Sequence, residues 1–432
     1  MRNGGNIWLR RRAVAGAGAV LLAAALGISA CGGKAASEQQ NAETVQKTGT
    51  GQAEVLAQSA EAGAGASDQS ANGSGSGLQQ AAPVWSDMKP ERSMELSYAQ
   101  QFSVDYYDGG YDLIQVQDDS TYLVVPEGAA VPEGLPASIT VLQKPLDHVY
   151  LAATSAMDLI ASLGRVDRIT LSGTKESGWY VDAAKQAMAD GAISYAGKYS
   201  APDYEQILSS DCDLALESTM IYHVPDVKAQ LEQLKIPVFV ERSSYETHPL
   251  GRMEWIRLYG VLFDEEEKAE QLFKEQAEQL DAVLAEQSTG KSVAFFYITT
   301  NGAVNVRKPG DYVAKMIELA GGSYVPQTAD VDENALSTMN MQMETFYAEA
   351  KDVDCLIYNS TIDGELQTLD ELLQKSPLLA DFKAVKNGNV WCTGKNMFQE
   401  TMGLGNMILD MHAVLSEDAP DESGLHYLHR LK

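Results

Sequence analysis

Basic residues are scarce in this sequence. Its 432 residues include 32 lysines and arginines against 60 aspartates and glutamates, so the formal net charge is −28. Proteins bind DNA or RNA through basic side chains that neutralise phosphates, and the deficit therefore argues against a nucleic-acid partner. It also argues against a polybasic surface that binds membranes. Self-repulsion keeps a strongly acidic chain soluble, which predicts a monomer.

Cysteine is equally rare, and no two cysteines have C-x-x-C spacing. Besides Cys31 there are only Cys212, Cys355 and Cys392, so a disulfide framework is not expected in so long a chain. The motifs G-x-S-x-G and H-E-x-x-H and the Walker glycine loop are also absent, which argues against common hydrolases and nucleotide-binding enzymes. We expect no resident cofactor and no catalytic residues.

The six histidines lack the paired spacing of a zinc or manganese site, so we predict no metal site. One alternative stays open. His223 and His248 follow neighbouring predicted strands, and they could meet near Glu217 or Glu241 to hold a bare metal ion.

The first apolar run is short. Residues 13–27 follow Arg10-Arg11-Arg12 and are too few to span a bilayer of about 30 Å comfortably as a helix. A secretory signal has this order: a basic segment, then an apolar segment, then small residues. The run ends in Ile28-Ser29-Ala30-Cys31, which resembles the bacterial lipobox. We therefore expect residues 1–30 to be a lipoprotein signal peptide and Cys31 to carry the lipid. An ordinary secretory signal is the alternative.

Residues 31–92 contain no aromatic residue before Trp85 and consist mainly of Ala, Gly, Ser, Gln and Glu. Such a segment cannot bury enough apolar surface to offset the entropy lost on ordering. The composition predicts a disordered tether over 31–92. The folded part would then be held at the extracytoplasmic face of the cell membrane by its lipid anchor alone.

The remaining chain alternates apolar strand-like runs with segments of helical spacing. This pattern predicts an α/β fold with two Rossmann-like lobes and mainly parallel sheets. Between the lobes lies a long amphipathic segment with apolar residues three and four positions apart. We expect an N-terminal lobe over 93–263, one long rigid linking helix over 264–289 and a C-terminal lobe over 290–432.

The two lobes contain one pair of similar segments. The sequence PDYEQIL precedes the strand-like run DLALEST, and METF precedes DCLIYNST. Each begins an acidic helix, passes through a polar turn and enters a strand that ends in polar residues. Glu205 and Glu344 lie near the two helix starts.

Together these features resemble the solute-binding lipoproteins of ABC importers, in particular the iron-siderophore and cobalamin group, whose lobes are joined by a single helix. The resemblance covers residues 145–415, whereas 94–144 depart from the short N-terminus of that group. Four stretches carry it: PDYEQILSSDCDLAL, LEQLKIPVFVE, GDYVAKMIELAGG and LLADFKAVKNGNVW.

The resemblance implies capture of an iron-siderophore, corrinoid or related metal chelate between the lobes, and its delivery to an ABC permease and its ATPase. In that family one glutamate in each lobe pairs with permease arginines, and Glu205 and Glu344 occupy the matching positions here. A cleft hydrolase and a lipoprotein that binds a bare metal ion are the alternatives.

In open α/β sheets, ligands bind beyond the carboxyl ends of the strands. Arginine and aromatic side chains at predicted strand ends would suit an anionic, aromatic-rich ligand. Arg307, which precedes a predicted helix in NVRKPGDY, is the first candidate. The full set of candidate ligand-binding residues is Lys175, Trp179, Glu217, Tyr222, Tyr245, Arg252, Tyr297 and Arg307.

Overall fold

The computed structural model of this chain describes residues 82–286, 288–327, 338–416 and 420–432. The expected signal peptide, Cys31 and residues 31–81 of the expected tether lie outside these ranges. Residues 82–92 do not continue the tether, because Trp85–Asp87 form a 3₁₀ turn and β1 begins at Pro90. Within the described ranges, every helix is too short or too polar to cross a membrane.

The N-terminal part of the first lobe is a five-stranded sheet of order β1-β2-β3-β4-β5. All neighbours are antiparallel except β4 and β5, which are parallel. Along β3, Ile114 and Val116 face the main core, while Tyr111 and Leu113 face a smaller core on the other side. Its strands are β1 (Pro90–Ser93), β2 (Phe102–Tyr107), β3 (Tyr111–Val116), β4 (Thr121–Val125) and β5 (Ile139–Gln143).

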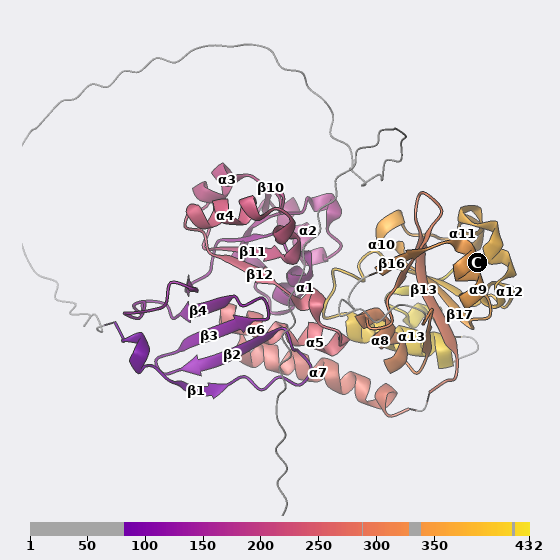
Figure 1. Cartoon of the computed structure of the whole chain (residues 1–432), viewed down its shortest axis with the longest axis horizontal. Helices are drawn as coiled ribbons and strands as arrows, with labels where there is room; N and C mark the ends of the chain where they lie inside the picture. Colours follow the sequence, from indigo (N-terminus) through magenta and orange to yellow (C-terminus); the bar gives the residue numbers. More distant parts are fainter. Residues whose placement is uncertain (1–81, 287, 328–337, 417–419) are drawn as a thin grey trace, which may run out of the picture. The chain divides into compact units, whose positions relative to one another are not determined.

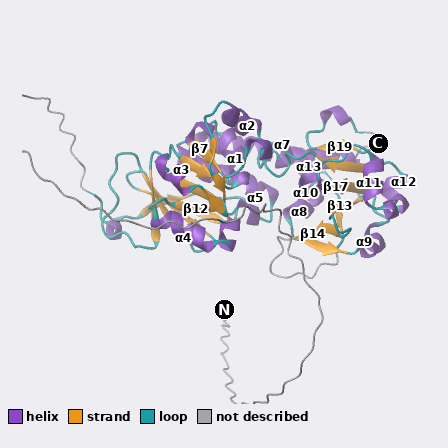
Figure 2. Ribbon diagram, turned by 90° about the horizontal axis from the view of Figure 1, so that it is seen from above, coloured by secondary structure: helices purple, strands orange, loops and turns teal. Residues whose placement is uncertain are grey.

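The second sheet of this lobe is entirely parallel and has the order β12-β11-β6-β7-β8. Its strands are almost wholly apolar because helices cover both faces. Figure 2 shows α1 and α2 on one side of the sheet and α3 and α4 on the other. The strands are β6 (Val149–Leu151), β7 (Ile169–Ser172), β8 (Ser194–Tyr195), β11 (Leu214–Ser218) and β12 (Val238–Glu241), and the helices are α1 (Thr154–Ser162), α2 (Asp182–Ala189), α3 (Tyr204–Ser209) and α4 (Pro225–Gln233).

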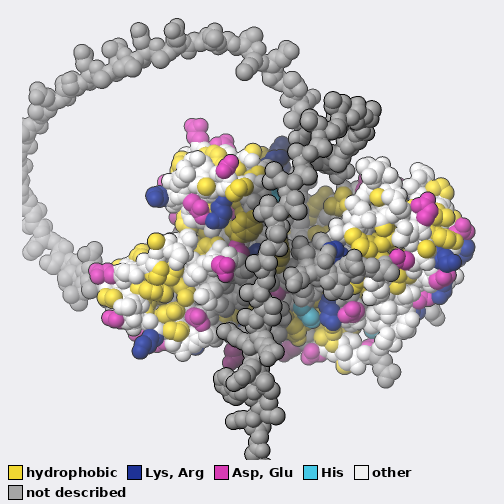
Figure 3. Space-filling model, viewed as in Figure 1, with side chains coloured by type: hydrophobic (Ala, Val, Ile, Leu, Met, Phe, Trp, Pro, Cys, Tyr) yellow, Lys and Arg dark blue, Asp and Glu magenta, His cyan; other side chains and the backbone are white. Residues whose placement is uncertain are grey.

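Three consecutive helices lead out of this lobe: α5 (Pro249–Glu254), α6 (Ile256–Phe263) and α7 (Glu266–Leu284). The uninterrupted α7 has 19 residues and is the predicted linking helix, with narrower bounds than 264–289. It buries Ala269, Phe273 and Leu280, which recur at helical spacing. The remaining residues of α7 are mostly polar, and many are acidic. Over the side of the molecule drawn in Figure 3, acidic side chains, in magenta, are spread out rather than gathered in one patch.

The C-terminal lobe contains a mixed sheet of order β16-β14-β13-β17-β18-β19, with β15 also paired to β13. Its centre is parallel, as predicted, but β14, β16 and β19 run antiparallel to their neighbours. Figure 1 shows this lobe in orange and yellow. The strands are β13 (Ser292–Ile298), β14 (Val304–Arg307), β15 (Ser323–Val325), β16 (Thr338–Met341), β17 (Cys355–Tyr358), β18 (Val390–Thr393) and β19 (Leu428–Arg430). The helices are α8 (Tyr312–Leu319), α9 (Met343–Ala350), α10 (Ser360–Asp363), α11 (Leu369–Lys375), α12 (Lys383–Lys386) and α13 (Leu404–Ser416).

Two buried carboxylates fasten the N-terminal sheet to the helices that follow β12. Glu254 accepts hydrogen bonds from the backbone N–H groups of residues 97, 98 and 99, each at 2.8 Å. Glu246 accepts those of residues 100 and 101 at 2.9 Å. Five successive N–H groups in the loop before β2 are thus satisfied by two side chains. We call residues 97–101 the captured loop.

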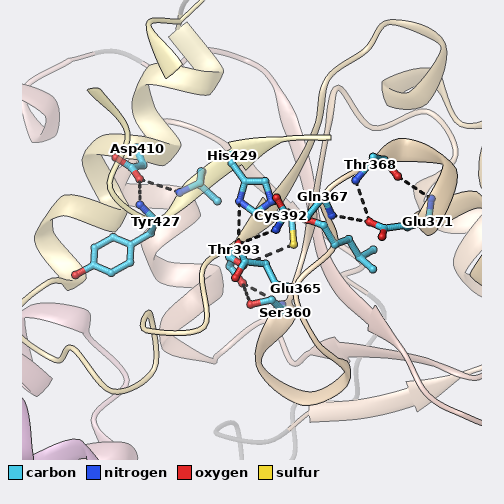
Figure 4. A network of polar contacts seen from close by, with 12 residues as sticks. Ser360, Glu365, Gln367, Thr368, Glu371, Cys392, Thr393, Asp410, Tyr427 and His429 are labelled. Atoms are coloured by element: carbon cyan, nitrogen blue, oxygen red, sulfur yellow. Dashed lines mark hydrogen bonds and ion pairs between the residues drawn. The ribbon is translucent and has the colours of Figure 1, made fainter. Parts of the chain in front are cut away.

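A third buried carboxylate holds the C-terminal strand in the same way. Asp410 on α13 accepts hydrogen bonds from the backbone N–H groups of His426, Tyr427 and Leu428 (Figure 4). A carboxylate can accept several hydrogen bonds at once, so one aspartate satisfies the N–H groups leading into β19. The strand is thereby fixed against the helix on which the sheet packs.

The captured loop gives the first prediction. Glu254→Ala leaves three backbone N–H groups without their partner and should lower the free energy of unfolding by about 2–4 kcal/mol. Urea unfolding followed by circular dichroism measures this. Glu270→Ala is the matched control, because Glu270 is exposed and pairs with the same Arg257 as Glu254 does; it should cost at most about 1 kcal/mol. Equal losses in the two variants would contradict the stabilising role of Glu254.

Candidate functional site

A cavity of about 500 Å³ lies beyond the carboxyl ends of β6, β11 and β12. Neighbouring parallel strands bring these ends to one edge of the sheet, where ligands bind in open α/β folds. The volume falls within the range of about 300–1,000 Å³ that is usual for small-molecule sites. First-lobe residues form one wall: Ala152, Thr154, Ser155, Ser218, Thr219, Met220, Glu241, Ser243, Ser244, Tyr245 and Arg252. C-terminal-lobe residues form the other: Arg307, Asp311, Tyr312, Met397, Phe398, Thr401 and Leu404.

Arg252, on α5, brings a positive charge to the first wall. Its guanidinium carbon lies 3.7 Å from the centroid of the Tyr312 ring. Its Nε donates a hydrogen bond to the carbonyl of Ser243 at 3.0 Å, which orients the side chain. Among the residues that the structure describes, no carboxylate forms an ion pair with Arg252. Its charge is therefore open to an anionic ligand.

Arg307 ends β14 and brings a second positive charge from the other lobe. Its Nη1 lies 3.6 Å from Oδ2 of Asp311, and its guanidinium carbon lies 5.0 Å from the centroid of the Phe398 ring. The Tyr324 hydroxyl donates a 2.6 Å hydrogen bond to the Arg307 carbonyl, which fixes the backbone there. Asp311 also caps α8 by accepting from the N–H of Val313 at 2.9 Å. Arg307 is thus held in place by the start of α8.

The buried carboxylate of the first wall is fully engaged. Glu241 accepts a hydrogen bond from the Ser155 hydroxyl at 2.9 Å and one from the backbone N–H of Ser243 at 2.7 Å. These contacts join the start of α1 to the turn that follows β12. Glu241 therefore shapes the cavity wall from behind.

Three of the predicted ligand-binding residues line the cavity, namely Tyr245, Arg252 and Arg307. Tyr245 stacks with Arg242, whose guanidinium carbon lies 4.3 Å from the ring centroid. Tyr297 lines a smaller cavity of about 370 Å³, which shares Arg307 and Phe398 with the first. The two cavities are neighbours around these shared side chains.

The structure does not bring Lys175, Trp179 or Tyr222 to the cavity lining. Trp179 is fully buried in the main core, and its indole N–H donates to the hydroxyl of Ser172. The Lys175 ammonium lies over the Tyr195 ring. The Tyr222 hydroxyl donates to Asp118, which lies in the turn between β3 and β4. Packing on other elements explains each placement.

Glu217 also lies outside the cavity lining, on the opposite face of β11. Successive side chains of a strand alternate between faces, so Ser218 reaches the cavity while Glu217 shares the face of Ala215. Glu217 is fully buried, and neither of its carboxyl oxygens has a hydrogen-bond partner among the residues that the structure describes. Burial raises the pKa of this carboxyl to about 8. The prediction that Glu217 binds the ligand is therefore not supported by its position, because the alternation places this side chain in the core.

Sequence reasoning missed most of the second wall. Asp311 and Tyr312 directly follow the NVRKPG stretch. An Asp before a predicted helix is a typical N-cap, and this signal could have placed both residues beside Arg307. Phe398 and Thr401 lie in the irregular segment between β18 and α13, where neither periodicity nor a motif marks them. In the described ranges, no group of three or more His, Cys, Asp or Glu side chains could hold a metal ion.

Comparison with known proteins places the chain in a family. A model of the periplasmic binding protein family matches residues 149–397, which is more than half of the sequence. The chain belongs to this family. It is of the class whose two α/β lobes are joined by a single helix. Periplasmic binding proteins of this kind bind small molecules and work with an ABC permease and its ATPase.

Among curated proteins, the chain is similar to an uncharacterised lipoprotein of Methanocaldococcus jannaschii. The two are 25% identical over 357 residues, covering 75% of this chain and 82% of the relative. Among solved structures, a periplasmic haem-binding protein of Vibrio cholerae matches 60% of this chain and 96% of its own, with 18% identity and a TM-score of 0.50. One from Pseudomonas aeruginosa matches 66% and 98%, with 17% identity and a TM-score of 0.50. These two likenesses establish the fold.

Glu217 gives the second prediction. Its folded-state pKa of about 8 is above the usual value of 4.5, so the fold keeps the proton after the unfolded chain has lost it, and stability falls as the pH rises from about 4.5 to about 8. Glu217→Gln removes this titration. The loss of unfolding free energy between pH 5 and pH 9 should shrink by about 2–4 kcal/mol relative to the unsubstituted protein.

Urea unfolding at several pH values measures this difference. Glu278→Gln, a change at an exposed carboxylate on α7, should leave the pH profile unchanged. A Glu217→Gln profile that runs parallel to that of the unsubstituted protein would show that the carboxyl is not neutral in the fold.

Proposed function

We propose that the protein is the lipid-anchored solute-binding component of an ABC import system. It captures an iron-siderophore, a corrinoid or a related metal chelate in the cavity and delivers it to the permease. One observation carries the proposal: Arg252 and Arg307, from opposite walls of the cavity, both contact the start of α8, at Tyr312 and at Asp311.

The chemistry of the lining supports an anionic, aromatic ligand. Guanidinium groups offer planar pairs of donors to carboxylate or catecholate oxygens, and they are less strongly hydrated than ammonium groups. Tyr245, Tyr312 and Phe398 add ring surface on which a flat or aromatic ligand can stack. Haem, which two proteins of the same fold bind, has this combination of a flat ring and carboxylates.

Anchoring through Cys31 supports the same role. The residue lies outside the described residues, and the proposal rests on the lipobox resemblance and on the lipoprotein name of the relative from Methanocaldococcus jannaschii. Two or more acyl chains hold a protein stably at a membrane, where one gives only marginal binding. The binding protein would then act at the extracytoplasmic face of the cell membrane, close to its permease.

Glu205 and Glu344 are proposed to dock the permease. Glu205 is exposed in the first turn of α3, and Glu344 is exposed in the first turn of α9. The two helices have matching places: α3 is followed by β11, which pairs with β6, and α9 is followed by β17, which pairs with β13. Within the described residues neither glutamate has an ion pair, so both charges are free to meet basic groups. Exposed charges of this kind steer encounter and fix orientation.

The proposed ligand class is tested with haemin and ferric siderophores as probes in titration calorimetry. Arg252→Ala and Arg307→Ala should each weaken binding by about 1.5–3 kcal/mol, because each removes a charge-assisted hydrogen-bond donor. Arg168→Ala is the control, since Arg168 pairs with acidic residues outside the cavity lining. Unchanged affinity in both cavity variants would contradict the proposed site. Native mass spectrometry of protein from its own host would identify the solute.

The docking proposal is tested with the double variant Glu205→Ala, Glu344→Ala. Ligand affinity should stay unchanged, while uptake and permease-stimulated ATP hydrolysis should fall sharply because the two charged contacts are lost. The matched control is Asp226→Ala with Asp370→Ala, which removes one exposed first-turn carboxylate from each lobe. If both double variants transport alike, the docking face does not depend on Glu205 and Glu344.

A further inference from the structure

A second cavity, of about 540 Å³, lies between the inner face of the N-terminal sheet and the start of α7. It shares no lining residue with the cavity described above. Most of its lining precedes residue 149, where the family match begins. Figure 1 shows the sheet beside α6 and α7. The lining residues that matter are Arg92, Tyr106, Asp112, Lys144, Asp264 and Glu266.

Asp112 is the unusual residue of this cavity. It lies on β3 directly opposite Tyr106 of β2, on the same face as Ile114 and Val116, which pack into the main core. Only 7% of the residue is exposed. Its side chain has no hydrogen bond or ion pair within the described part of the chain. Burying a carboxylate without a partner is costly, so this position calls for a compensating group.

The basic groups of the cavity are engaged elsewhere. The Lys144 ammonium lies 2.7 Å from Oδ1 of Asp264. The Arg92 guanidinium carbon lies 3.5 Å from the centroid of the Tyr106 ring. Glu266, in the first turn of α7, is exposed and has no ion pair among the described residues.

The charged groups of this cavity that lack a partner among the described residues are therefore carboxylates. The lining as a whole contains the carboxylates of Glu91, Asp112, Glu127, Asp264 and Glu266, against the side chains of Arg92 and Lys144. A ligand that completes this cavity must be a cation. Metal ions are not the favoured class, because the described carboxylates do not converge in a group of three that could hold one.

We propose that this cavity binds a small organic cation through a primary ammonium group, which Asp112 accepts while Glu266 and the Tyr106 hydroxyl flank it. An ammonium group has three donors and can serve all three acceptors. Two further carboxylates, Glu91 and Glu127, also line the cavity and suit a ligand with a second amine.

Protonation of Asp112 makes the proposal measurable. The pKa of this carboxyl is raised to about 7, mainly by burial; Lys144 and Arg92 lower it, and Glu266 and Asp264 raise it. An ammonium ligand binds the ionised carboxylate, so its affinity should rise with pH. Because the ionised fraction grows about tenfold between pH 6 and pH 8, the affinity should rise by about the same factor.

The experiment is titration calorimetry of the full chain with 1,4-diaminobutane as the probe and 1,4-butanediol as the uncharged analogue. The diamine should bind and the diol should not. Asp112→Asn should weaken diamine binding by about tenfold or more at pH 8 and remove the pH dependence. Glu266→Gln, at an exposed position that cannot disturb the core, should weaken it less and keep the pH dependence. Asp108→Asn, an exposed carboxylate in the turn between β2 and β3, should behave as the unsubstituted protein.

Three results would overturn the proposal: no heat from the diamine at millimolar concentration, equal binding by Asp112→Asn, or equal binding of the diol. Calcium binding that depends on Asp112 and displaces the diamine would replace the proposed ligand class by a metal ion. Circular dichroism of each variant separates loss of binding from loss of fold. None of these outcomes depends on what the cavity between Arg252 and Arg307 binds.

Discussion

Capture of five backbone N–H groups by Glu246 and Glu254 is the contact on which the arrangement of the first lobe depends. Donors lower the cost of withdrawing an ionised carboxylate from water, and here the donors are the successive amides of the captured loop. Glu246 also accepts from the indole N–H of Trp255, which lies in the main core. The loop before β2 and the helices after β12 are therefore one unit, although more than 140 residues separate them in sequence.

This unit reaches the ligand cavity. Arg252 lies between the two carboxylates in sequence, so the segment that grips the captured loop also presents the first-lobe arginine. Further contacts reinforce the same wall, because the Tyr122 hydroxyl donates to the carbonyl of Val238 in β12 and Asp118 receives the Tyr222 hydroxyl. The N-terminal sheet, which precedes the residues that the family model matches, thus supports the wall from behind. Its own cavity at Asp112 gives the same sheet a second surface for small molecules.

Features set by residues close together in the sequence could be predicted, whereas features set by contacts between distant residues could not. Periodicity and caps are local, so the linking helix predicted over 264–289 is present as α7, which begins two residues later and ends five residues earlier. The edge of the sheet at which ligands bind follows from parallel topology, and Arg252 and Arg307 were found through it. The face of a sheet that a side chain occupies changes with each residue along the strand. A sequence pattern does not define the strand that finely, so it did not predict that Ser218 lines the cavity while Glu217 lies in the core. The capture of residues 97–101 joins distant parts of the chain, and no local pattern indicates it.

The pairing of Arg307 with Asp311 has a consequence for how the protein meets its ligand. The lining of the cavity between Arg252 and Arg307 carries two arginines and two carboxylates, Glu241 and Asp311, so its formal charge is zero when it is empty. The chain as a whole carries −28 and repels anions that come within a Debye length of its surface, about 8–10 Å. An anionic solute is therefore slowed on approach and held only at short range, where Arg252 is unopposed. Added salt would screen the repulsion more than the contact, so association would speed up with ionic strength, the reverse of ordinary electrostatic steering.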